Sequence, residues 1–107
     1  MLECGSIHDM KTAKQMERHF KGAANHRRIE ILLWIDAHAG VTVEDLAENL
    51  HTNFKTISQH TRSLAQSGLV DKHYRGRAVA HNLSPYGKRF VKFIKEFQRV
   101  DSKQSTY

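Results

Sequence analysis

At 107 residues, with 39% hydrophobic and 26% charged residues, the chain can form one globular domain but not a deep catalytic cavity enclosed on every side. Its longest apolar run, residues 31–35, is far shorter than the ~20 residues that a membrane span needs. The first residues lack the apolar stretch of a signal peptide, so we expect a cytoplasmic protein without a membrane partner. The single cysteine, Cys4, cannot form an internal disulfide and is expected to be a free thiol.

The formal net charge of +6 is concentrated in the second half of the chain. Residues 1–50 hold six Lys and Arg against eight Asp and Glu, whereas residues 51–107 hold eleven against three. A basic surface of this kind is typical of proteins that bind the phosphates of nucleic acids. A basic face that only improves solubility is the alternative, and charge alone does not decide between the two.

Three helices are predicted in the first half of the domain. The first covers about residues 11–22 and the second about 25–38, because apolar side chains recur there at helical spacing. The second is apolar almost all round, which indicates the central buried helix, and Gly40 ends it. A third helix begins at Thr42, where Thr42 and Asp45 can form a capping box.

A fourth helix follows the short polar break at 51–53, with Asn53 as its N-cap, and ends at Gly68. Two β-prone segments at 69–83 then predict a hairpin whose tip is Arg75-Gly76-Arg77. Ser84 and Pro85 start the last helix. The buried side of the fourth helix is expected to hold Phe54, Ile57, Thr61 and Leu64.

This order of four helices, a hairpin and a helix predicts a winged helix-turn-helix domain, mainly α with a small β-hairpin. The single domain is expected to cover residues 11–100, with flexible ends at 1–10 and 101–107. In such a domain the second helix of the helix-turn-helix pair enters the major groove of DNA. The fourth helix would therefore contact bases and phosphates.

The fourth helix is rich in short polar side chains, which are mediocre helix formers but allow a close approach to DNA. Gln can pair with adenine, Arg with guanine, and Ser or Thr with phosphate or several bases. A solvated helix face is the alternative for each residue alone. The capped helix before it, the three-residue turn and the basic hairpin together favour DNA binding. The candidate contact residues in this helix are Lys55, Thr56, Ser58, Gln59 and Arg62.

Four consecutive stretches, HRRIEILLWI, TVEDLAENL, TISQHTRSLAQSGLV and RGRAVAHNLS, resemble the ArsR family of winged-helix repressors over about residues 16–98. The resemblance implies that Arg75 and Arg77 at the wing tip reach the flanking minor groove or backbone. His60 stands where the family usually has His, which either supports the helix or contacts DNA. Thr61 replaces a larger apolar residue, which suggests local repacking. The groove-facing residues implied by the match are Thr56, Ser58, Gln59 and Arg62.

The metal sites of this family are missing from the two places where the resemblance would put them. The helix at VEDLAENL has no Cys or His, and the last helix offers Glu96 but no His among its cations. None of the eight histidines forms an i, i+4 pair on one predicted helix. We therefore expect no metal and no cofactor, with any effector unknown. A metal-responsive repressor with an atypical histidine site, for which Cys4 and His8 are the best route, is an alternative.

The first and last helices exceed what a DNA-binding unit requires. The last carries four aromatic residues at spacings of four, three and four, and a domain of this size cannot bury all of its apolar edges. A two-fold homodimer would cover them and place two recognition helices about 34 Å apart, matching a palindromic operator. The resemblance implies the same mode of dimerisation. The interface candidates are Met16, Phe20, Phe90, Phe93, Ile94 and Phe97.

The sequence therefore predicts a homodimeric repressor that binds double-stranded DNA. It contains no paired nucleophile and base, no glycine-rich phosphate loop and no clustered carboxylates, so we do not expect an enzyme. A winged-helix protein-protein interaction module without DNA binding is the rival from a different class. The arginines of the fourth helix and the hairpin argue against that rival, because an interaction module does not need them.

Overall fold

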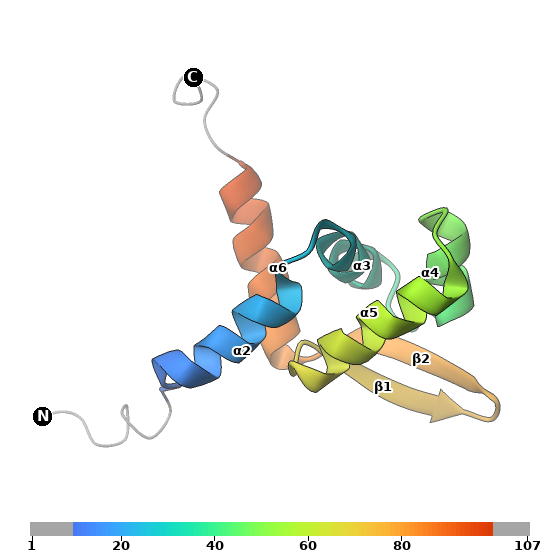
Figure 1. Cartoon of the computed structure of the whole chain (residues 1–107), viewed down its shortest axis with the longest axis horizontal. Coiled ribbons are helices and arrows are strands. Elements are labelled where there is room, and N and C mark those ends of the chain that lie inside the picture. The colour runs from blue at the N-terminus through green and yellow to red at the C-terminus, as the bar shows by residue number, and fades with distance from the viewer. Residues whose placement is uncertain (1–9, 100–107) are drawn as a thin grey trace, which may run out of the picture.

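The computed structural model describes residues 10–99, so the predicted flexible ends lie outside the described residues except for Met10. Within this range the chain forms five helices and a two-stranded antiparallel hairpin (Figure 1). This arrangement confirms the predicted winged helix-turn-helix fold. The elements in chain order are α2 (Ala13–Ala23), α3 (His26–Ala37), α4 (Val43–Asn49), α5 (Phe54–Gln66), β1 (Val70–Arg75), β2 (Ala78–Leu83) and α6 (Pro85–Gln98).

Side-chain caps determine where the helices begin. The Asn53 side chain accepts hydrogen bonds from the amides of Lys55 and Thr56 at 2.7 and 3.3 Å, which starts α5 where the sequence predicts. Thr42 and Asp45 form the predicted capping box of α4. Ser84 caps α6 through the amide of Gly87, with a proline at the first helical position. These interactions are local, so the sequence shows them directly.

The core is centred on α3, which lies between α6 and the α4–α5 pair (Figure 1). Its residues Ile31, Leu32 and Ile35 are at most 1% exposed, which confirms the predicted central helix. Every other element contributes an apolar side chain to the same cluster, so α5 and the hairpin are both anchored to α3. The buried residues from the neighbouring segments include Ala23, Val41, Leu46, Ile57, Leu64, Leu69, Val70, Leu83 and Val91.

The hairpin is attached to the domain at its base and free at its tip. Its register runs from Val70 opposite Leu83 to Arg75 opposite Ala78. Backbone hydrogen bonds of 2.9 Å join His81 to Val41 and to Gly40, so the loop before α4 extends the sheet at β2. The hairpin is therefore held at one end and projects from the domain at the other.

Two residues differ from their predicted roles. Phe54 is 52% exposed at the start of α5, so the prediction that it is buried is wrong. Only Ile57, Thr61 and Leu64 form the buried side of α5. The second is Gly87, which in the first turn of a helix is expected only to weaken the start of α6. A Cβ there would collide with the backbone carbonyl of Leu69, so glycine is what allows α6 to approach that segment closely.

His81 is a buried histidine at the base of the hairpin, 1% exposed. Its Nδ1 lies 3.1 Å from the carbonyl oxygen of Val41, and because a carbonyl only accepts, Nδ1 carries the proton and donates it. Burial lowers the pKa of His81 below its usual 6.5, and the hydrogen bond to Val41 offsets part of that effect. The folded domain therefore keeps this ring neutral at a pH where the unfolded chain begins to protonate it.

This difference predicts an acid-sensitive fold. Below pH 6.5 the unfolded state binds more protons at His81 than the folded state, so the free energy of unfolding should fall as the pH drops toward the lowered pKa. The slope from one proton reaches about 1.4 kcal/mol per pH unit, measurable by urea unfolding at a series of pH values. His81→Gln should reduce this slope without abolishing it, because burial also lowers the pKa of His60. His73→Gln, at an exposed position of β1, should leave it unchanged. An equal slope in both variants would contradict the assignment.

Candidate nucleic-acid interface

One side of α5 is anchored in the core and the other faces solvent. Ile57, Thr61 and Leu64 are at most 2% exposed. Since these residues repeat at helical spacing, the positions between them face outward. Ser58 and His60 are half-buried on the flanks of that outward face. The predicted contact residues that the structure exposes on it are Lys55, Thr56, Gln59 and Arg62.

The turn between α4 and α5 is short and internally hydrogen-bonded. His51 adopts a left-handed conformation with φ 52°, which is uncommon for a residue other than glycine. The amide of Thr52 donates to the carbonyl of Ala47 at 3.0 Å, and the Thr52 hydroxyl donates to the carbonyl of Leu50 at 2.9 Å. These bonds fix the direction in which α5 leaves α4.

The wing tip presents two arginines beyond the end of the core. Arg75 and Arg77 are exposed on either side of Gly76, whose φ of +61° makes the two-residue turn. β1 packs against α5, and the hairpin tip lies on the same side of the molecule as the N-terminal end of α5 (Figure 1). The arginine-tipped loop and the exposed face of α5 therefore lie on the same side of the molecule and could contact the same duplex.

The charges on these two elements are almost entirely positive. α5 contains Lys55 and Arg62 but no Asp or Glu. The only carboxylate in the two strands is Asp71, which pairs with Asn82 near the base of the hairpin and away from its tip. A polyanion therefore meets no carboxylate on α5 or at the wing tip.

His60 has a partner that the sequence does not indicate. The Nε of Arg28, in the first turn of α3, donates to His60 Nδ1 at 3.1 Å, and both side chains are half-buried. Burial lowers the pKa of His60, and the nearby charge of Arg28 acts in the same direction. Thr61, next to it, donates its hydroxyl to the Ser58 carbonyl at 2.9 Å, which satisfies a polar group at a buried position. This contact fits one of the two expected roles of His60, support of the helix, and its contact with DNA stays a prediction.

Phe54 is a second residue that sequence reasoning missed on this face. The sequence assigns it to the core by its spacing from Ile57, yet its ring is 52% exposed beside Lys55 and Thr56. An apolar side chain at the start of a recognition helix can contact the methyl group of thymine in the major groove. Its position directly after the N-cap Asn53 is the signal that could have identified it.

A metal centre is not formed by the described residues. Among residues 10–99, no group of three or more His, Cys, Asp or Glu side chains is arranged to hold a metal ion. Cys4 and His8, the candidates for an atypical site, lie outside the described residues.

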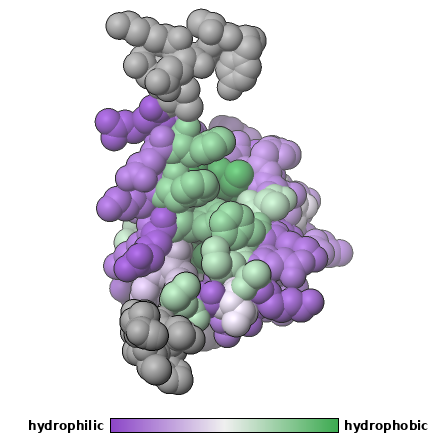
Figure 2. All heavy atoms as spheres, turned by 90° about the vertical axis from the view of Figure 1, so that its left-hand side faces the viewer, coloured by the Kyte–Doolittle hydropathy of each residue, from purple (hydrophilic) through white to green (hydrophobic). Residues whose placement is uncertain are grey.

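A second surface, formed by α2 and α6, is apolar and exposed. Figure 2 shows apolar side chains gathered over these two helices. Phe90 and Ile94, also predicted for the interface, are half-buried. The predicted interface residues with large exposed areas are Met16 (45%), Phe20 (50%), Phe93 (50%) and Phe97 (70%).

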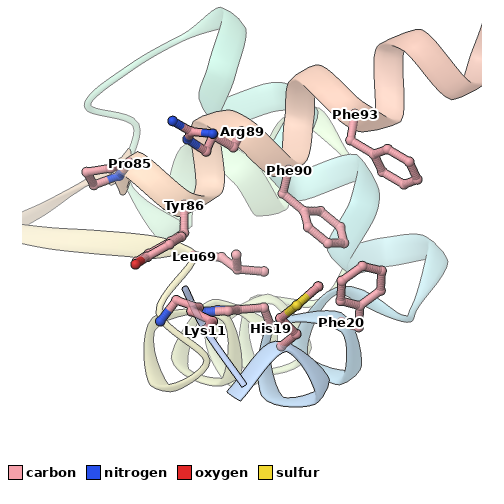
Figure 3. A pocket seen from close by; sticks show the side chains of 10 residues that line it. Lys11, His19, Phe20, Leu69, Pro85, Tyr86, Arg89, Phe90 and Phe93 are labelled. Atoms are coloured by element: carbon pink, nitrogen blue, oxygen red, sulfur yellow. The ribbon is translucent and has the colours of Figure 1, made fainter. Parts of the chain in front are cut away.

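A groove of about 770 Å³ runs between α2 and α6 (Figure 3). Phe20 and Phe90 face each other across it with ring centroids 5.3 Å apart, and Phe93 and Phe97 continue the row along α6. At the other end the His19 ring stacks on Tyr86 at 5.0 Å. Aromatic side chains of α2 and α6 therefore form one continuous surface along the groove.

A sequence model of the MarR family matches residues 24–74, just under half of the chain, from the residues before α3 into the first strand of the wing. No curated protein matches the chain. No helix among residues 10–99 combines the length and the apolar character required to span a bilayer.

Solved structures with the same fold cover most of the chain. HlyU from Vibrio cholerae is 24% identical, with a TM-score of 0.71 over 90% of this chain and 97% of its own. The transcriptional repressor PagR of Bacillus anthracis is 17% identical, with a TM-score of 0.70 over 86% and 99%. A homodimeric winged helix-turn-helix DNA-binding domain from Mycobacterium bovis, described as part of a possible ArsR-family transcriptional regulator, is 26% identical with a TM-score of 0.72 over 79% of both chains.

HlyU and PagR, both under 25% identical, support the fold alone. The MarR-family sequence model and the relative from Mycobacterium bovis support a winged-helix transcriptional regulator that binds DNA. The expectation that the chain is not an enzyme agrees with them. They do not single out the ArsR family, because the matching sequence model is that of MarR and ArsR is named only for a structural relative. The ArsR resemblance therefore stays a prediction.

Proposed function

We propose that this chain is a homodimeric repressor of the ArsR type, without that family's usual metal sites, which binds a palindromic site in double-stranded DNA. In this proposal Thr56, Gln59 and Arg62 contact base edges in the major groove, with Ser58 and His60 at the flank. Lys55 contacts phosphate, and the wing arginines Arg75 and Arg77 meet the flanking backbone or minor groove. The observation that carries it is the carboxylate-free exposed face of α5 beside an arginine-tipped wing.

The homodimer is proposed from the apolar surface on α2 and α6. A monomer rarely exposes a continuous row of aromatic side chains, and a two-fold axis through this surface would bury the row against its own copy. The homodimeric relative from Mycobacterium bovis supports this assembly. Two recognition helices would then face successive turns of one side of the duplex, which is why the operator is proposed to be palindromic.

The wing provides the first test. Replacing Arg75 and Arg77 by alanine should weaken binding to all duplexes and reduce the slope of log K against log salt by up to about 1.8, because two phosphate contacts are lost. The measurement is a fluorescence anisotropy titration at four or more salt concentrations.

A matched control removes the same charge from α6, with Lys88→Ala and Lys92→Ala, two exposed cations outside the wing tip. Lys88 lies near the base of the hairpin, beside Asp71 and Asn82. The control should change the slope little. Equal changes in the two double variants would mean that the wing contributes only net charge. Undetectable binding of the unchanged protein even at low salt would instead favour the interaction module.

Base recognition by Gln59 provides the second test. Gln59→Ala should relax the preference at one base position in each half-site, at a cost of about 1–3 kcal/mol in discrimination. The measurement is selection from a randomised duplex library. Gln66→Ala is the control, because Gln66 is exposed on the same helix but at its C-terminal end. An unaltered preference in the Gln59 variant would remove this residue from the contact set.

The dimer surface provides the third test. Phe93→Glu places a charge in the middle of the aromatic row and should convert the protein to monomers, because a buried carboxylate without a partner is costly. Sedimentation analysis measures the change. Tyr74→Glu, at a 76% exposed aromatic position of the wing, should leave the assembly intact. A monomeric unchanged protein, or a Phe93→Glu variant that is still dimeric, would contradict the proposed interface.

A further inference from the structure

Arg28 connects three helices through one guanidinium group. It lies in the first turn of α3, where its Nη1 donates to the carbonyl of Gly22 in α2 at 3.1 Å. Its Nε donates to Nδ1 of His60 in α5, also at 3.1 Å. The side chain is half-buried, so these hydrogen bonds are partly protected from water. Arg28 therefore ties a helix of the apolar surface to the recognition helix.

α2 is also attached to the C-terminal end of α5. The Nδ1 of His19 donates to the Ser67 carbonyl at 2.6 Å, since a carbonyl can only accept. Gly22 lies so close to the Ser67 side chain that a Cβ at position 22 would collide with it. Together with the Arg28 contact, α5 is held against α2 at its end and at its middle. A shift of α2 would therefore be transmitted to α5.

The contact with Arg28 also fixes where the proton of His60 resides. A guanidinium group only donates, so His60 Nδ1 must accept, and the proton of the neutral ring is on Nε2. Nε2 makes no hydrogen bond to any of the residues 10–99. Arg28, Arg27 and His26, all from the start of α3, are the charged groups of the described chain that act on this ring, and each favours its neutral form.

The position of His60 makes this proton useful for recognition. His60 lies one helical turn after Thr56, on the flank of the exposed face of α5. Its Nε2 edge is directed away from Arg28, and a neutral imidazole held in this orientation offers one hydrogen-bond donor. Phosphate oxygens and the acceptors of guanine and thymine in the major groove are suitable partners for such a donor.

We propose that Arg28 is a positioning residue for DNA recognition: it holds the His60 ring with its proton on Nε2, as a donor to the duplex, and fixes α5 against α2. This inference rests on the proposed function, because it assigns a task to two residues at the proposed DNA-binding face. Arg28 itself does not have to touch the DNA.

The test begins with the 107-residue chain in the absence of DNA. Two-dimensional ¹⁵N–¹H spectra of the histidine rings distinguish a protonated Nε2 from a protonated Nδ1. In the unchanged protein His60 should show a proton on Nε2 and titrate below pH 6.5. Arg28→Met keeps the length of the side chain but removes the charge and the donors, and it should give mixed tautomers and a higher pKa for His60.

Arg27→Met is the matched control. It removes the same charge from the neighbouring position, but Arg27 bonds to Glu30 at 2.9 Å rather than to His60. It should therefore preserve the tautomer of His60. For DNA binding, the probe is a duplex that the unchanged protein selects from a random library. Arg28→Met should lower affinity for this duplex about tenfold and for unrelated DNA by less than about twofold, whereas Arg27→Met should affect both duplexes alike.

The outcomes separate this inference from the proposed function. A His60 ring that carries its proton on Nδ1, or that titrates at its ordinary pKa in the unchanged protein, overturns the inference whatever the DNA result, and this spectrum needs no variant to fold. Equal losses of selective binding in the Arg28 and Arg27 variants also overturn it, because charge alone would then explain the effect. If no duplex is selected from the library but His60 carries its proton on Nε2 and titrates below pH 6.5, the proposed function fails and the assigned tautomer of His60 is supported.

Discussion

The burial of Ile57, Thr61 and Leu64 in the interior of the domain decides which side of α5 is available for contact. Because helix positions repeat every 3.6 residues, fixing this side leaves Lys55, Thr56, Gln59 and Arg62 outside. Full burial of one aliphatic side chain contributes roughly 1.5–3 kcal/mol, whereas each residue of low helix propensity costs only a few tenths. Core burial therefore offsets the low helix propensity of the short polar side chains on the outer face of α5. Such side chains would allow a close approach to DNA.

The second consequence of this packing is a separation of tasks between two sides of the domain. α5 and the wing supply exposed polar and positive groups. α2 and α6 supply an aromatic surface (Figure 2). The two sides are joined by specific contacts rather than by the core alone. His19 reaches the Ser67 carbonyl, and Arg28 bridges Gly22 and His60. In the proposed homodimer, these contacts would couple the way in which two copies meet through α2 to the position of α5.

The parts of the structure that the sequence predicts correctly depend on neighbours along the chain. Asn53 caps the residues just after it, and Gly76 makes a turn between strands that are adjacent in sequence. The failures concern partners that are distant in sequence. Phe54 has the spacing of a core residue but finds no space in the core, and the need for Gly87 comes from the carbonyl of Leu69, eighteen positions earlier. The bond from Arg28 to His60 spans 32 positions, and no local pattern indicates it.

The outward face of α5 and the wing tip are proposed to bind one side of a DNA duplex. Hydroxyl-radical footprinting of the unchanged protein on a duplex selected from a random library tests this most directly. We expect protection in two symmetric half-sites whose centres are about one helical turn, or 34 Å, apart, with additional protection at the flanks where the wings would lie. Uniform reactivity along every duplex at low salt, with no protected half-site, would contradict it.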